Sequence, residues 1–271
     1  MLDSNKTGLY LFKSKDWGLN DFEVLDKFKE HGFDIVCLYC IDPPEQLKKC
    51  IAYARQIGLC VDTLHAPFKF AEEIWFENTE DYFNSIKDYL IVCAEMNIKY
   101  FVMHSSNKEC LPFTDIGLKR FKELVKMAKK LNVIILLENL RMVDHMIFVL
   151  EQIKSQNLQV CLDFGHANIW SYPSKYLLKK YKTHIKALHI CDNFGLSSGD
   201  IHLIPFKGNI DWNENMSLLS KYYNGPLILE IDNFKTQEYR YNDIDKYLND
   251  AKCAVEKLKA MYNKFLKSNK K

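Results

Sequence analysis

The sequence predicts a single-domain α/β protein of the (β/α)8, or TIM barrel, class, and three observations favour this prediction. Short apolar runs rich in β-branched residues alternate with amphipathic segments of helix length, and the alternation occurs eight times. The chain has 271 residues, a length common among single α/β barrels. Its 48% of hydrophobic residues is enough for one large core. Eight such units joined by right-handed crossovers close into a barrel.

The strands are expected at the β-branched apolar runs, and the helices at the segments that follow them. In chain order, the expected strands are residues 8–12, 34–40, 60–65, 100–104, 133–138, 160–163, 185–189 and 227–230. The expected helices are residues 19–31, 44–57, 78–96, 115–131, 144–155, 174–181, 212–222 and 243–265.

A doubly wound open sheet is the main alternative fold, but no expected strand is followed by a glycine-rich turn of the GxGxxG or GxxxxGK[ST] type. No Pro/Ser/Gly linker divides residues 1–271, so one domain is expected. Four lysines, at 264, 267, 270 and 271, predict a solvated and frayed terminus over residues 266–271.

The net charge of +2 gives no general attraction to polyanions. No apolar stretch reaches the roughly 18 residues needed to cross a bilayer, and the polar first six residues do not resemble a signal peptide. We therefore expect a soluble, cytoplasmic protein without membrane association. Its nine cysteines are spread mostly over apolar runs, which suits buried, reduced thiols. Cys37 and Cys40 form a CxxC, but a strand would point them to opposite faces.

Residue types that bind metal ions close six consecutive strands of the expected barrel. They are His65, His104, Glu138, Asp163, His189 and Glu230. Because the carboxyl ends of barrel strands meet at one mouth, we expect these side chains to converge there. His166 adds a DxxH with Asp163, and Asp200 and His202 form a DxH whose side chains point the same way in an extended segment.

Each of these residues alone fits a hydrogen-bonded core position or a helix cap equally well. Together, four carboxylates and five imidazoles at one mouth would resist burial unless divalent cations neutralised them. Mixed nitrogen and oxygen ligands favour zinc, manganese, iron or cobalt over calcium, with magnesium less suited. The other histidines, His31, His145 and His184, lie in or beside expected helices and are interpreted as surface or packing residues.

Six segments of the chain resemble the xylose isomerase-like barrel superfamily, which includes sugar-phosphate isomerases and epimerases and the endonuclease IV type of abasic-site nuclease (AP endonuclease family 2). The segments are HAPF at 65–68, LLEN at 136–139, CLDFGHAN at 161–168, LHICDN at 188–193, DIHLIPFKGNIDW at 200–212 and LILEI at 227–231. The combination of DxxH, HxxDN and DxHxxxxxG is specific for the superfamily but not for one activity within it.

For the isomerases and epimerases, the resemblance implies one divalent ion held by Glu138, Asp163, His189 and Glu230. Glu138 and Glu230 would also be the acid/base pair that moves protons on opposite sides of a sugar or sugar phosphate. The ion would stabilise the enediolate. His166 would contact substrate oxygens.

For the nucleases, the resemblance implies three zinc ions and nine ligands, and all nine residue types occur in order. They are His65, His104, Glu138, Asp163, His166, His189, Asp200, His202 and Glu230. In this alternative a metal-bound hydroxide would cleave a phosphodiester of abasic DNA. The expected mouth loops, residues 66–76, 139–145 and 190–201, contribute only Lys69 and Arg141 to a phosphate track.

We therefore favour a metal-dependent isomerase or epimerase acting on a small sugar, with DNA as a partner only in the alternative. Association of the barrel into a homo-oligomer is left open.

Overall fold

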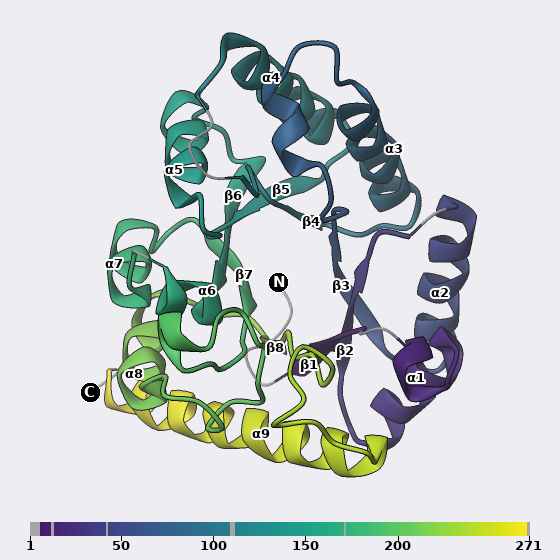
Figure 1. Cartoon of the computed structure of the whole chain (residues 1–271), viewed down its shortest axis with the longest axis vertical. Coiled ribbons are helices and arrows are strands. Elements are labelled where there is room, and N and C mark those ends of the chain that lie inside the picture. The colour runs from purple at the N-terminus through teal and green to yellow at the C-terminus, as the bar shows by residue number, and fades with distance from the viewer. Residues whose placement is uncertain (1–5, 12–13, 42, 109–111, 171, 270–271) are drawn as a thin grey trace.

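The computed structural model describes residues 6–11, 14–41, 43–108, 112–170 and 172–269. Within them, eight parallel strands form one sheet in the order β7, β6, β5, β4, β3, β2, β1, β8. The sheet curls into a nearly closed barrel with the helices outside it (Figure 1). At the seam, the Ile190 amide donates to the Ile228 carbonyl at 3.0 Å, and the Glu230 amide donates to the Ile190 carbonyl at 3.0 Å. The predicted single-domain (β/α)8 TIM barrel is confirmed, and the doubly wound sheet is excluded.

The strands lie where the apolar runs predicted them. They are β1 Thr7–Tyr10, β2 Ile35–Tyr39, β3 Cys60–His65, β4 Tyr100–Met103, β5 Ile134–Glu138, β6 Leu158–Asp163, β7 Ile185–His189 and β8 Leu227–Leu229. The first strand ends at Tyr10, and Phe12, the predicted end, lies outside the described residues.

The main helices are α1 Asp21–Glu30, α2 Pro44–Gln56, α3 Asp81–Glu95, α4 Asp115–Lys130, α5 Val143–Gln152, α7 Ser174–Lys180, α8 Trp212–Tyr222 and α9 Ile244–Ser268. The structure adds a short helix that was not predicted, α6 Phe164–Ile169, and three 3-10 turns, η1 Ser14–Trp17, η2 Ala71–Trp75 and η3 Gly195–Ser197. Helix α9 continues to Ser268, three residues beyond its predicted end, and residues 270–271 lie outside the described residues. The frayed terminus over residues 266–271 therefore stays a prediction. Among the described helices, none is both long and apolar enough to cross a membrane.

Alternation of side chains along the strands divides the interior from the exterior of the barrel. Phe101, Leu137 and Leu188 belong to the large cluster that the helices cover. Val102, Leu136 and Ala187, one residue away on each strand, belong to a separate small cluster. Because side chains point to alternate faces, this second set fills the barrel interior, and the next inward position on each strand lies at the mouth.

One buried carboxylate organises the loop that follows β7. Both oxygens of Asp192, which is 0% exposed, accept hydrogen bonds: Oδ2 from the Trp212 indole at 2.9 Å and from the Phe206 amide at 2.8 Å, and Oδ1 from the Ile210 amide at 3.2 Å. Asp192 and Leu203 also form a backbone bridge. These bonds hold the intervening residues, which include the DxH pair, against the barrel mouth.

We expect Asp192→Ala to lower the free energy of unfolding by about 3 kcal/mol, because several buried donors lose a charged acceptor. As the control, Asp211→Ala removes the exposed cap of α8, which accepts from the Glu214 amide at 2.9 Å, and should cost about 1 kcal/mol. Urea denaturation of both variants measures the two losses. Equal losses would contradict the role given to Asp192.

Candidate metal centre

Side chains from the ends of four neighbouring strands meet in one buried group. Glu138, Asp163 and His189 are the last residues of β5, β6 and β7, and Glu230 directly follows β8. One ligand atom from each of the four lies within 4.8 Å of the others. The four residues are at most 3% exposed. All four sit at inward positions of their strands, as the alternation predicts, so the sheet register alone brings them together.

His189 is the centre of this group. Its Nδ1 lies 3.1 Å from Glu138 Oε1 and 3.0 Å from Glu230 Oε2. Its Nε2 lies 3.0 Å from the hydroxyl of Tyr10, which lies 2.8 Å from Thr63 Oγ1. A hydrogen bond on the far nitrogen of a ligating histidine fixes the ring and its tautomer. Tyr10 therefore orients His189 toward the two glutamates.

Asp163 has two roles, one for each oxygen. Its Oδ1 accepts a hydrogen bond from the His166 amide at 2.5 Å and so caps helix α6. Its Oδ2 is buried and has no hydrogen-bond partner. Asp163 can therefore both cap the helix and bind a metal ion. With the DxxH spacing, Oδ1 makes the cap and Oδ2 faces the four-residue group.

Several buried atoms of this group fit a divalent cation. Glu138 Oε1, Asp163 Oδ2 and His189 Nδ1 make no hydrogen bond of good geometry, although Glu138 Oε1 and His189 Nδ1 lie 3.1 Å apart as an ion pair. Such atoms are expensive in a protein interior unless an ion or a proton satisfies them. Three carboxylates and one imidazole also suit zinc, manganese, iron or cobalt.

The pKa directions indicate the same demand for positive charge. Burial would lower the pKa of His189, but the charges of neighbouring groups, Glu230 and Glu138 among them, raise it well above its usual value. Burial raises the pKa of Asp163 to about 6. For Glu230 burial acts in the same upward direction, but the charge and hydrogen bond of His189, together with the charge of His202, outweigh it and hold the pKa at about 2. The raised pKa of His189 thus reflects the negative charge around its ring.

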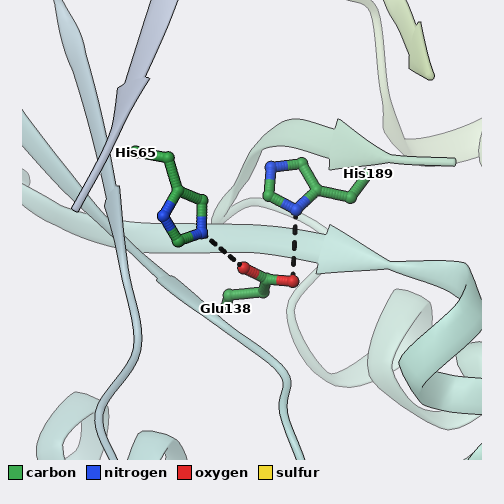
Figure 2. Close-up of side chains that lie close together, drawn as sticks. All are labelled: His65, Glu138 and His189. Carbon is green, nitrogen blue, oxygen red and sulfur yellow. Dashed lines mark hydrogen bonds and ion pairs between the residues drawn. The ribbon is translucent and has the colours of Figure 1, made fainter. Parts of the chain in front are cut away.

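Two further groups of possible ligands adjoin the first. His65, Glu138 and His189 form one of them. Figure 2 shows Glu138 between the two rings, with Oε2 3.1 Å from His65 Nε2 and Oε1 3.1 Å from His189 Nδ1. His104 reaches the same carboxylate, since its Nε2 lies 3.2 Å from Glu138 Oε2.

The last group joins His166, Asp200 and His202. Asp200 Oδ1 lies 2.9 Å from His202 Nε2 and 3.6 Å from His166 Nε2. The other nitrogen of His202 lies 2.7 Å from the Glu230 carbonyl oxygen. The structure thus brings all nine predicted residues to the barrel mouth. The other three histidines lie apart from these groups, and His145 is a packing residue that is 1% exposed and 5.1 Å from the Trp75 ring.

The groups open into a cavity of about 740 Å³. Its walls include apolar and aromatic side chains, among them Leu38, Tyr39, Phe68 and Ile231. Lys69 and Lys235 are the basic residues among its described lining residues. Arg141, which was expected at the mouth, lies with its guanidinium over the Trp170 ring, 5.5 Å from the centroid. A cavity of this size and character suits a small molecule.

Three residues at the mouth were not predicted. Tyr10 and Tyr39 end the first two strands, and the Tyr39 hydroxyl donates to Glu230 Oε1 at 2.8 Å. The strand-end rule did not point to these tyrosines, because the first two expected strands end at positions 12 and 40. Lys235, whose ammonium lies 2.7 Å from Asp200 Oδ2, follows β8 in an irregular loop, and no sequence pattern marks it.

Comparison with protein families and with curated proteins gives one matching family and several matching proteins. The family described as xylose isomerase-like TIM barrel matches residues 25–259. Uncharacterized protein y4fM of Sinorhizobium fredii is 35% identical over 83 residues, which are 30% of this chain and 24% of that protein. Apurinic-apyrimidinic endonuclease 1 of Plasmodium berghei is 27% identical over 210 residues, which are 66% of this chain and 40% of that protein. The chain thus covers less than half the length of each of these two relatives.

Solved structures share the fold over nearly the whole chain. D-psicose 3-epimerase from Clostridium cellulolyticum H10, solved with D-tagatose, has a TM-score of 0.75 at 16% identity and covers 95% of this chain and 99% of its own. The IolI protein, solved with a zinc atom, has a TM-score of 0.74 at 18% identity and covers 94% of this chain and 99% of its own.

We expect Tyr10→Phe to weaken the binding of manganese or zinc about tenfold, because His189 loses the partner that orients its ring. The matched control is Tyr262→Phe, which removes a buried hydroxyl that donates to the Tyr223 carbonyl at 2.6 Å on the outer helices. Competition titration against a chelating dye measures both affinities. An equal loss in the two variants would show that Tyr10 acts only through stability.

Proposed function

The chain belongs to the xylose isomerase-like TIM barrel family, and we propose that it is a divalent-metal-dependent isomerase or epimerase of a sugar or sugar phosphate. One observation carries the proposal. A cavity of about 740 Å³ leads to a buried centre in which two glutamates approach the same imidazole nitrogen from β5 and β8. A site of this kind encloses a small molecule and offers it two proton carriers. The epimerase of similar fold, solved with D-tagatose, supports a sugar as the substrate.

Glu138, Asp163, His189 and Glu230 would hold the ion, with manganese, zinc, cobalt or iron preferred over magnesium. When bound, such an ion polarises neighbouring substrate oxygens and stabilises the negative charge of an enediolate. The zinc atom in the structure of IolI supports this choice of metals.

The residues of the chain supply the proton transfer. One glutamate takes the proton from the carbon beside the carbonyl. In an isomerisation the other glutamate gives a proton to the neighbouring carbon, and in an epimerisation it gives one to the opposite face of the same carbon. Tyr39 donates to Glu230 Oε1, which leaves Oε2 turned toward the centre. His166, which is 4% exposed and lines the cavity, would bind substrate oxygens. The apolar walls keep bulk water from the reacting carbon.

A specific observation favours a second candidate, a three-zinc phosphodiesterase of the endonuclease IV type. The mouth has three groups of possible ligands, and one of them, His166, Asp200 and His202, shares no residue with the four-residue group. The curated endonuclease of Plasmodium berghei is a relative by sequence. The two lysines that line the cavity are few for a DNA backbone, and this ranks the candidate second.

We expect Glu230→Gln to reduce turnover at least about 100-fold, because the amide cannot accept the proton. Hydrogen exchange in D2O at the carbon beside the carbonyl, screened over ketoses and their phosphates, measures the loss. Glu214→Gln, on the exposed start of α8, should leave exchange unchanged. Full exchange activity in Glu230→Gln would remove Glu230 as a proton carrier.

We also expect one manganese, zinc, cobalt or iron ion per chain in protein purified without added metal or chelator. His202→Ala should keep that ion, because His202 lies outside the four-residue group. Elemental analysis of both proteins gives the ratios. A ratio near three zinc ions that falls in His202→Ala, together with cleavage of abasic DNA, would instead support the phosphodiesterase.

A further inference from the structure

Lys235 forms an ion pair with Asp200, the carboxylate of the DxH loop. Its ammonium lies 2.7 Å from Asp200 Oδ2, and the two side chains are 34% and 30% exposed. Lys235 comes from the loop between β8 and α9, whereas Asp200 comes from the loop after β7. Both residues line the cavity, so the ion pair joins two loops across its rim.

The pair occupies one of the two oxygens that Asp200 offers to a metal ion. Oδ1 faces the nitrogens of His202 and His166, while Oδ2 accepts from Lys235. Any ion held by His166, Asp200 and His202 would therefore lie on the far side of one carboxylate from a fixed ammonium group.

The His166, Asp200 and His202 group differs from the four-residue group in its formal charge. Glu138, Asp163 and Glu230 give the four-residue group a formal charge of −3, so a divalent ion leaves it at −1. Asp200 gives its group a charge of −1, and Lys235 brings that to zero. A divalent ion there would add two positive charges beside an ammonium, against the single negative charge left on the four-residue group, which is electrostatically unfavourable.

We propose that Lys235 is the built-in counter-ion of the His166, Asp200 and His202 group, and that it keeps this group free of metal. The group then positions the rim of the cavity and contacts substrate. This inference rests on the proposed function, because Lys235 would limit the mouth to the single metal ion that the proposed isomerase uses. Lys235 could also act in the opposite way. If it oriented Asp200 toward an ion, it would strengthen the binding of metal by this group.

The experiment counts the zinc ions that depend on His202. Full-length protein is equilibrated with zinc chloride and desalted, and zinc per chain is measured by elemental analysis. In the wild-type background His202→Ala should remove no zinc. Lys235→Met keeps most of the side-chain stem and removes the charge. In that background His202→Ala should remove one zinc ion. The His166, Asp200 and His202 group of Lys235→Met should bind this zinc at least about tenfold more tightly than the wild-type group does.

Two matched variants control for charge and for folding. Lys235→Arg keeps the positive charge and should behave as the wild type, whereas Lys69→Met removes another lysine that lines the cavity and should add no zinc. Thermal unfolding identifies any variant that is not folded, and then the Lys235→Gln form replaces Lys235→Met.

Zinc lost from the wild type on His202→Ala would overturn the proposal, and so would a Lys235→Met protein with unchanged or reduced zinc. These counts do not depend on turnover. Chains with the expected counts but no hydrogen exchange on any ketose would retain the role of Lys235 and reject the proposed function.

Discussion

Three carboxylates buried around one imidazole are the constraint on which the rest of the mouth depends. Glu138, Asp163 and Glu230 are each at most 3% exposed, and their mutual repulsion must be balanced within the protein. Two tyrosines hold the group from outside. Tyr10 forms a hydrogen bond with the ring of His189, and Tyr39 donates one to Glu230. Asn139 ties β5 to β6 beside them, since it exchanges hydrogen bonds of 2.8 and 2.7 Å with the backbone of Asp163. The polar shell therefore holds the three carboxylates in place around His189.

The barrel seam lies next to this charged centre. Strands β7 and β8 meet through the bridge between Ile190 and Leu229, whereas the other neighbouring strands pair over three or more residues. His189 and Glu230 stand on opposite sides of that seam, and their side chains are 3.0 Å apart. The ion pair between His189 and Glu230 thus links β7 and β8, the two neighbouring strands with the fewest paired backbone residues.

The fold and the nine residues of the site were predictable because both follow from local patterns. Apolar runs mark the strands, and the residue that ends each run lies at the mouth of any barrel. Helix α6 was missed because it has six residues and follows β6 directly, with the last strand residue as its N-cap. Tyr10, Tyr39 and Lys235 were missed because their roles depend on partners 179, 191 and 35 residues away in the chain. Such contacts are set by the closed barrel and leave no periodic trace in the sequence.

The double use of Asp163 has a consequence for substitutions in this centre. One oxygen of Asp163 ends a backbone helix while the other faces the centre, so histidine or cysteine at this position would give up the cap in exchange for a softer ligand. The carboxylate of Glu138, by contrast, contacts histidine side chains. A substitution at Asp163 would therefore remove a helix cap together with a candidate ligand, whereas one at Glu138 would leave the backbone at the end of β5 without a lost cap.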